Sequence, residues 1–287
     1  MLSLEKVPGN FGARITGCDL SGADELTLHA ILTSLMEHRF VIIPGQHLEN
    51  AEYVAFARRW GRPVHLISRR IVDKDFPEMI VQGNLASTPE FKRNAANHWH
   101  CDSSYEKEYA TTTMLYGIES PDHGGETLFA DLAGAFAALP AEEQALYRGM
   151  TIWHGTSRGT MLPDESNTSY DRLPPEFQKD IVVLDPVTHP LVVDHPVARR
   201  SAFYGLGGSC YAIDGMDEAE GADLLLKLRR YVTQPRFLSQ CKLMPGDLLI
   251  WDNLSVMHRA TPIEYSDAPG ETRLNYRISL KGVPEFA

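Results

Sequence analysis

Two histidines and one aspartate in this sequence could hold a metal ion between them. His100 and Asp102 lie two residues apart in the HWHCD run at 98–102, and side chains two apart on an extended strand point to one face. His258, from a distant part of the chain, would complete a set of two imidazole nitrogens and one carboxylate oxygen. Such a facial triad leaves the opposite coordination positions open and is typical of non-haem Fe(II) oxygenases.

Other polar residues supply what an iron-bound 2-oxo acid would need. Its far carboxylate requires a cation, and the planar fork of an arginine such as Arg273 makes paired, charge-assisted hydrogen bonds. The hydroxyl of Thr127 could donate a further bond. Each residue alone has a simpler explanation: a histidine and an aspartate two apart are more often a hydrogen-bonded pair, Thr127 fits an ordinary strand, and Arg273 fits a solvated edge. Only the combination favours a 2-oxo acid site.

The elements that must position these residues begin with helices and short strands. Apolar residues recur at helical spacing over 24–39, a short apolar strand follows at 40–43, and Asn50 is expected to cap a helix over 51–60. We therefore expect residues 1–77 to form an α/β layer that packs on a larger body.

The sequence pattern changes at about residue 78, from where short apolar runs are separated by Gly, Pro, Asn and Asp. Many short strands favour a sandwich or barrel over a doubly wound sheet. Helices are predicted over 132–150, where Pro140 divides the pattern, and over 217–231. Strands are predicted at 79–82, 98–102, 111–118, 181–184, 191–193, 202–204, 248–251 and 272–280.

The segment 155–180 is rich in Gly, Ser, Thr, Pro, Asp and Asn and is long for a connection. Loops of this length in compact domains are often active-site lids, although a disordered insertion fits the composition equally well.

Bulk composition excludes several classes of protein. The 287 residues are 43% hydrophobic and 23% charged, which is ordinary for a globular chain. A net charge of −11 leaves no basic stripe for nucleic acid. The sequence shows no secretory signal and no run of about 18 apolar residues that could cross a membrane. The 4 cysteines lack CxxC spacing, so a reducing cytoplasm is the expected location.

Taken in order, these motifs resemble the taurine/2,4-D type (TauD/TfdA) of Fe(II)- and 2-oxoglutarate-dependent dioxygenases. The resemblance covers nearly the whole chain and implies one catalytic domain over residues 1–287. The implied fold is mostly β with flanking helices around a double-stranded β-helix (jelly-roll) core. The matching motifs are residues 11–13 and 17–20, His100-Cys101-Asp102, Gly124-Gly125-Glu126-Thr127, His195-Pro196, Gly246-Asp247, Trp251-Asp252-Asn253, His258, Arg273 and Arg277.

The resemblance implies roles for individual residues. His100, Asp102 and His258 match the iron ligands, while Thr127 and Arg273 match the residues that bind the 2-oxoglutarate carboxylate. The interval between His258 and Arg273 is longer than in the taurine enzyme, which makes the Arg273 assignment weaker than that of the ligands. The implied reaction uses Fe(II), 2-oxoglutarate as cosubstrate and O2 to oxidise a C–H bond, with release of succinate and CO2. Related halogenases lack the carboxylate that Asp102 supplies.

The resemblance also implies a small-molecule partner that carries a carboxylate, sulfonate, sulfate or phosphonate. Arg277, four residues beyond Arg273, would face the same way on a regular strand and could bind this anion. An internal salt bridge to a protein carboxylate is the alternative. His98 and His65 are further candidates for substrate contact, and a core position is the alternative for His98. Homo-oligomers are expected because relatives often form them.

Two rival functions remain open from the sequence. A cupin-like metallohydrolase or zinc enzyme could use the same three ligands, but it would not need Thr127 and Arg273. A non-catalytic protein that binds a metal or a 2-oxo acid is the other rival. The sequence names neither the prime substrate nor the outcome of its oxidation.

Overall fold

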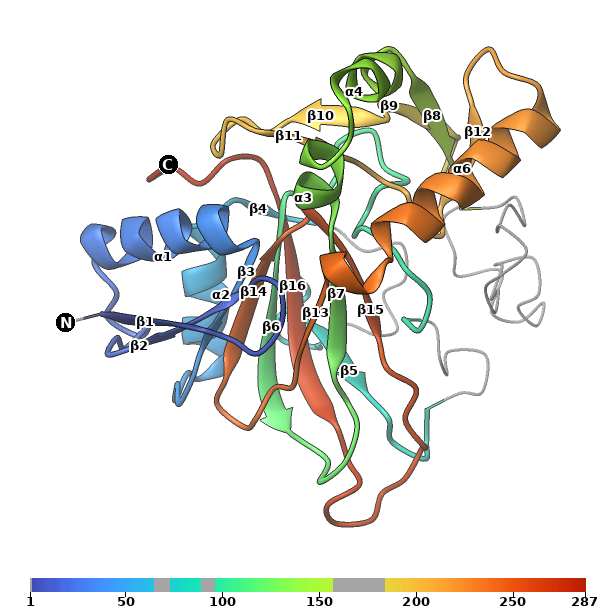
Figure 1. Cartoon of the computed structure of the whole chain (residues 1–287). Helices are drawn as coiled ribbons and strands as arrows, with labels where there is room; N and C mark the ends of the chain where they lie inside the picture. Colours follow the sequence, from blue (N-terminus) through green and yellow to red (C-terminus); the bar gives the residue numbers. More distant parts are fainter. Residues whose placement is uncertain (1, 65–72, 89–95, 157–183) are drawn as a thin grey trace.

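Figure 1 shows the computed structural model of the chain, which describes residues 2–64, 73–88, 96–156 and 184–287. His65, most of the predicted 155–180 loop and all but the last residue of the predicted strand at 181–184 lie outside the described residues. Strands predominate in the described part. None of its helices is long and apolar enough to cross a membrane.

The strands form one large sheet and several small ones. The large sheet has the order β1-β2-β3-β14-β6-β16-β4, with β5 also paired to β16, and only its β2–β3 pair is parallel. Facing it lies the sheet β13-β7-β15. The large sheet comprises β1 (Ser3–Lys6), β2 (Ala13–Thr16), β3 (Phe40–Ile43), β4 (Arg62–Pro63), β5 (Ile80–Gly83), β6 (Thr112–Glu119), β14 (Leu248–Asp252) and β16 (Leu274–Lys281). The facing sheet comprises β7 (Thr127–Asp131), β13 (Leu238–Cys241) and β15 (Val256–Ala260).

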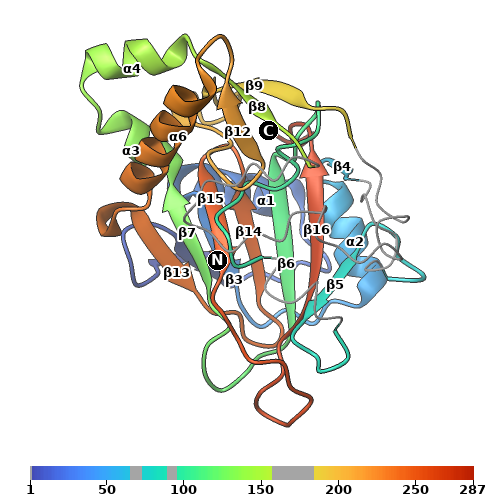
Figure 2. The ribbon, with the colours of Figure 1, turned by 90° about the vertical axis from the view of Figure 1, so that its right-hand side faces the viewer.

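The described residues also form two smaller sheets. They are β12 (Cys210–Ile213), β8 (Thr151–His154) and β9 (Val187–Pro190), and the pair β10 (Val192–Asp194) and β11 (Ser201–Phe203). The helices are α1 (Glu25–His38), α2 (Asn50–Arg58), α3 (Leu132–Ala137), α4 (Ala141–Arg148), α6 (Glu218–Val232) and the 3-10 turn η4 (Pro235–Phe237). In Figure 2, β13, β7 and β15 lie to the left of β6 and β16.

The predicted helices are confirmed within a few residues at each end. α1 begins where the Asp24 side chain accepts a hydrogen bond from the backbone N–H of Thr27 at 2.8 Å. Pro140 divides the predicted 132–150 helix into α3 and α4. The predicted Asn50 cap is wrong, because Glu49 caps α2 and forms a capping box with Glu52.

Three apolar clusters show how the layers pack. α1 and α2 cover one face of the large sheet, where Val41, Ile250 and Ile278 contribute to the first cluster. The alternate residues of the same strands, such as Ile42 and Trp251, point to the facing sheet and meet its side chains in a second cluster. α3 and α6 cover the outer face of the facing sheet over a third cluster. The second cluster, which we call the inter-sheet core, borders the predicted site.

Candidate metal centre

His100 and His258 meet through a pair of backbone hydrogen bonds. The His100 N–H donates to the His258 carbonyl at 3.0 Å, and the His258 N–H donates to the His100 carbonyl at 2.9 Å. Apart from this isolated bridge, residues 98–102 form no strand, so the strand predicted there is wrong. The chain turns at Ser103, whose φ is 53°. The bridge nevertheless brings the two imidazole rings to 4.2 Å between centroids.

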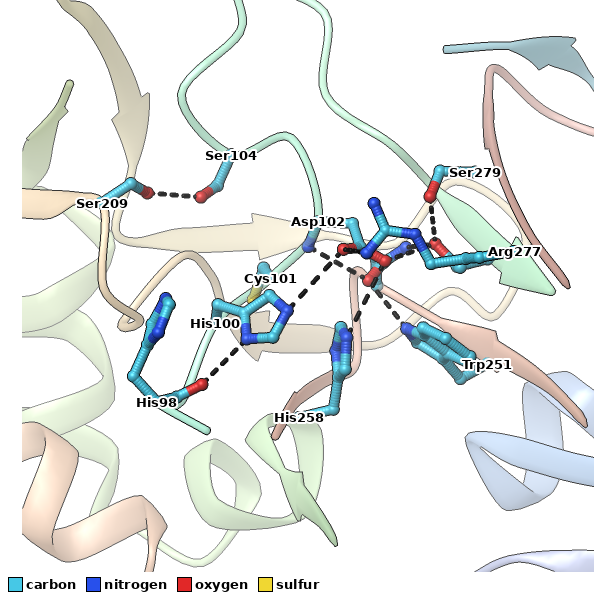
Figure 3. Close-up of polar contacts among 12 residues, drawn as sticks. His98, His100, Cys101, Asp102, Ser104, Ser209, Trp251, His258, Arg277 and Ser279 are labelled. Atoms are coloured by element: carbon cyan, nitrogen blue, oxygen red, sulfur yellow. Dashed lines mark hydrogen bonds and ion pairs between the residues drawn. The ribbon is translucent and has the colours of Figure 1, made fainter. Parts of the chain in front are cut away.

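Strand alternation explains why the site lies between the sheets. Val256 packs in the inter-sheet core, and His258, two residues further along β15, shares its face. The His258 ring lies 4.7 Å from the ring of Trp251, another member of that core. On β16, Ile278 packs under the helices, so its neighbour Arg277 faces the opposite way. Figure 3 shows His258, Arg277 and Trp251 around Asp102.

The three predicted ligands come together in one group, in which Asp102 and His258 are buried and His100 is partly exposed. Asp102 Oδ1 lies 3.8 Å from His100 Nε2, and Asp102 Oδ2 lies 3.8 Å from His258 Nε2. One donor atom from each residue lies within 4.8 Å of the other two. These separations are too long for hydrogen bonds. They suit ligands of one ion, since first-row metals bind nitrogen and oxygen at about 2 Å. In the described part of the chain, no other His, Cys, Asp or Glu group has this geometry.

A hydrogen bond orients His100 for a metal. Its Nδ1 lies 2.9 Å from the carbonyl oxygen of His98, and a carbonyl only accepts. Nδ1 therefore carries the proton, which leaves the lone pair on Nε2, the atom nearest Asp102. Metal-binding histidines are commonly fixed in this way.

Asp102 is ionised and held on both oxygens. The Thr113 hydroxyl donates to Oδ2 at 2.7 Å, and Arg277 Nη1 donates to Oδ1 at 3.2 Å. Burial raises the pKa of Asp102, but Arg277 and the two histidines outweigh burial and hold it well below its ordinary value. Burial lowers the pKa of His100 and of His258 to about 4. Near neutral pH the group thus offers two neutral imidazoles and one carboxylate, the donor set that a divalent metal requires.

Arg273 lies just before β16 with no carboxylate partner in the described residues. Its Nε is buried and has no hydrogen-bond partner there, and burial lowers its pKa. Its backbone is fixed, because its N–H donates to Asn84 Oδ1 at 2.6 Å. A Cβ atom at Gly125 would lie 3.4 Å from Arg273 Cδ, which places the arginine beside the strand that carries Thr127. An uncompensated buried guanidinium calls for an anionic ligand.

His98 lies beside the metal group but carries no charge near neutral pH. Burial lowers its pKa to about 3, with further contributions from His100 and Arg229. Its ring lies 5.1 Å from the His100 ring. On its other side lies Gly208, where a Cβ would stand 2.5 Å from the imidazole. His98 can therefore offer a neutral hydrogen bond to a ligand but no positive charge.

Sequence reasoning missed the residues that support the ligands. Asn253 Oδ1 accepts from Trp251 Nε1 at 3.0 Å, and Asn253 Nδ2 donates to the Thr113 hydroxyl at 2.8 Å. His195, named in the sequence only as part of a matching motif, accepts hydrogen bonds from two backbone N–H groups at Nδ1, and its Nε2 lies 3.2 Å from Asp252 Oδ1. The tryptophan–aspartate–asparagine motif signalled these contacts, but a motif does not reveal its distant partners.

A set of two histidines and one carboxylate with open coordination positions is typical of non-haem iron oxygenases. The comparisons with known proteins agree. The family model for the taurine catabolism dioxygenase TauD, TfdA family matches residues 3–279, and the chain belongs to this family.

Individual relatives resemble the chain over nearly their full length. The alpha-ketoglutarate-dependent 2,4-dichlorophenoxyacetate dioxygenase of Cupriavidus pinatubonensis is 30% identical over 89% of this chain and 91% of that enzyme. The alpha-ketoglutarate-dependent sulfate ester dioxygenase of Pseudomonas putida is 27% identical over 98% of this chain and 90% of that enzyme. A crystal structure of a taurine dioxygenase from Burkholderia xenovorans superposes with a TM-score of 0.77, at 25% identity over 98% of this chain and 89% of that one.

These comparisons confirm the predicted family and the class of enzyme, a 2-oxoglutarate-dependent dioxygenase. They also confirm the predicted use of Fe(II), 2-oxoglutarate and O2, which defines such enzymes. The assignment of roles to individual residues stays a prediction.

Proposed function

We propose that this chain binds Fe(II) through His100, Asp102 and His258 and oxidises a C–H bond of a small anionic substrate. The observation that carries the proposal is the buried triad, whose donor atoms lie within 4.8 Å of one another. The buried Arg273, whose Nε has no hydrogen-bond partner in the described residues, supports it, because a metallohydrolase with the same ligands would not need a buried cation there. Bound Fe(II) would supply the activation of O2, coupled to the oxidative decarboxylation of 2-oxoglutarate to succinate.

The protein's own contribution is binding and orientation. Arg273, with the Thr127 hydroxyl nearby, would hold the far carboxylate of 2-oxoglutarate by charge-assisted hydrogen bonds, each contributing about 1.5 to 3 kcal/mol. The His98 carbonyl keeps the proton of His100 on Nδ1 and so keeps Nε2 free for the metal. Thr113 and Arg277 hold the Asp102 carboxylate ionised between the two imidazoles.

The substrate's anion would meet Arg277, with His98 and the undescribed His65 as further contacts. The internal salt bridge that was the alternative for Arg277 is present, since its Nη1 lies 3.2 Å from Asp102 Oδ1. We propose that a carboxylate, sulfonate, sulfate or phosphonate takes over part of this pairing. Named substrates of relatives, a phenoxyacetate and sulfate esters, support an anion.

We further propose that the two facing sheets are the halves of a jelly-roll core within one catalytic domain, on which residues 1–77 form a packed layer. The inter-sheet core, with members from β3, β6, β14, β7, β13 and β15, supports this. Homo-oligomers and a cytoplasmic location belong to the same proposal. All four cysteines are free, as a reducing compartment would keep them.

The test is succinate release from a panel of aryloxyacetates, alkyl sulfates and alkyl sulfonates. We expect stoichiometric succinate only when Fe(II), 2-oxoglutarate and a true substrate are all present. Substrate turnover without 2-oxoglutarate would favour a metallohydrolase. Binding of metal and 2-oxoglutarate with no turnover across the panel would favour a non-catalytic binding protein.

A further inference from the structure

Thr113 is a fully buried hydroxyl that directly contacts a proposed metal ligand. Its Oγ1 has three polar neighbours: Asp102 Oδ2 at 2.7 Å, Asn253 Nδ2 at 2.8 Å and Ser279 Oγ at 3.1 Å. It lies on β6, whose ladder with β14 and β16 fixes its backbone on both sides. Nothing in the predicted catalytic set includes this residue.

The proton positions in this group follow from its chemistry. A hydroxyl has one proton and two lone pairs, whereas an ionised carboxylate only accepts. Asn253 has its oxygen toward Trp251 Nε1, which only donates, so the Asn253 NH2 donates to Thr113. The single Thr113 proton then goes to Asp102, and the Ser279 hydroxyl is left to donate to the remaining Thr113 lone pair. The Thr113 hydroxyl thus makes all three of its possible hydrogen bonds, and it donates its one proton to the Asp102 carboxylate.

We propose that Thr113 is the positioning residue for the metal-binding carboxylate. Its hydroxyl fixes the rotation of Asp102 about the Cβ–Cγ bond, so that the carboxylate presents its free lone pairs toward the Nε2 atoms of His100 and His258. The inference rests on the proposed metal site and assigns a role within it.

The second hydrogen bond to Asp102 cannot serve this purpose throughout a catalytic cycle. Arg277 Nη1 holds Oδ1 at 3.2 Å, but the guanidinium is the group proposed to turn toward an anionic substrate. Thr113 is neutral and enclosed by its three partners, so no anion draws it away. Asp102 therefore keeps its orientation while Arg277 exchanges partners.

Titration of the metal-free protein with Mn²⁺, followed by the EPR signal of free Mn²⁺, tests the role without turnover. Thr113→Val keeps the shape and removes the hydroxyl, and we expect Mn²⁺ affinity to fall about 10- to 100-fold, as for other groups that support metal ligands. Thr113→Ser restores the hydroxyl and should bind as the parent protein does. Thr112→Val is the matched control, because Thr112 is the preceding residue of β6 and its side chain points to the other face of the sheet.

Each outcome decides the proposal. Equal Mn²⁺ affinity in Thr113→Val and Thr112→Val would overturn it, as would a Thr113→Ser variant as weak as Thr113→Val. Circular dichroism checks the fold, and if Thr113→Val does not fold, Thr113→Cys carries the test with a weak thiol donor in the same place. Weaker binding in Thr113→Cys then supports the role, and unchanged binding overturns it. Asp102→Asn tests the proposed metal site separately from the role of Thr113. If Asp102→Asn binds Mn²⁺ as the parent protein does, the proposed metal site is wrong.

Discussion

The two arginines of the last strand region solve the problem of a buried charge in opposite ways. Arg277, within β16, pairs with Asp102 at 3.2 Å. Arg273, just before β16, has no carboxylate partner in the described residues, and its Nε is buried without a hydrogen bond. Burying a charge is costly unless it is paired. The Nε of Arg277 is also buried without a hydrogen bond, so the two arginines differ in the ion pair that Arg277 makes and that Arg273 lacks in the described residues.

This difference between Arg273 and Arg277 indicates which of them the proposed anionic cosubstrate would bind. A guanidinium keeps its charge at any physiological pH, so a buried one without a carboxylate partner is expected to bind an anion. An arginine with a partner can instead exchange that partner for a second anion. This contrast supports the proposed binding of the cosubstrate by Arg273 and of the prime substrate by Arg277.

The largest expected effect follows from removing the unpaired charge. Arg273→Met should raise KM for 2-oxoglutarate by about 100-fold or more, since two charge-assisted hydrogen bonds are each worth about 1.5 to 3 kcal/mol. Metal binding should not change, because Arg273 does not contact the triad in the structure. Succinate release at varied 2-oxoglutarate measures KM, and Mn²⁺ titration provides the control. An unchanged KM would remove the contrast between the two arginines.

The next effect concerns the paired arginine. Arg277→Ala should raise KM for the prime substrate by roughly 10- to 100-fold, the loss of one hydrogen bond to a charged group. KM for 2-oxoglutarate should change much less. Initial rates with the best compound of the panel, at saturating 2-oxoglutarate and then at saturating substrate, separate the two constants. Equal increases in both would show that Arg277 serves the cosubstrate or the metal site alone.

The sequence predicted the metal-binding residues of this site better than the residues that hold them in place. The spacing of His100 and Asp102 and the distant His258 predicted the buried triad, although the expected strand at 98–102 is only a bridge. The triad forms anyway because the backbone pairing of the two histidines, and not a strand, sets their distance. Spacing within one segment carries information about side chains on that segment only.

Thr113 and Asn253 could not have been predicted as supports for Asp102. They lie on β6 and after β14, and each of them contacts the Asp102 region only because those strands are neighbours in the large sheet. Strand order across a sheet depends on the whole topology. The same limit applies to Arg277, whose type and position were evident but whose partner was one of two alternatives.

A buried histidine, unlike Arg273, can avoid the cost of an unpaired buried charge because it can be neutral. His154 is fully buried in β8, its Nδ1 lies 3.0 Å from Ser209 Oγ, and its Nε2 has no partner in the described residues. Burial, with a contribution from His189, lowers the pKa of His154 to about 3. An imidazole can give up its proton at neutral pH, whereas the guanidinium of Arg273 cannot.

The smallest predicted effect is the pH dependence that this neutral histidine creates. In the unfolded chain His154 takes up a proton near its ordinary pKa of about 6.5, but in the folded protein it resists protonation until about pH 3. Protons therefore favour the unfolded state, and the stability contribution of His154 is present above pH 6.5 and lost as the pH falls below it, by at most about 1.4 kcal/mol per pH unit. His154→Asn, which keeps a polar atom near Ser209, should lose less stability than the parent between pH 6.5 and 5.5, by about 1 kcal/mol. Urea unfolding of the metal-free proteins at both pH values measures the difference, and the other histidines cancel because both proteins contain them. If the stability of the two proteins depends on pH identically, His154 is protonated inside the fold. Arg273 would then not be distinguished by being a buried cation without a carboxylate partner.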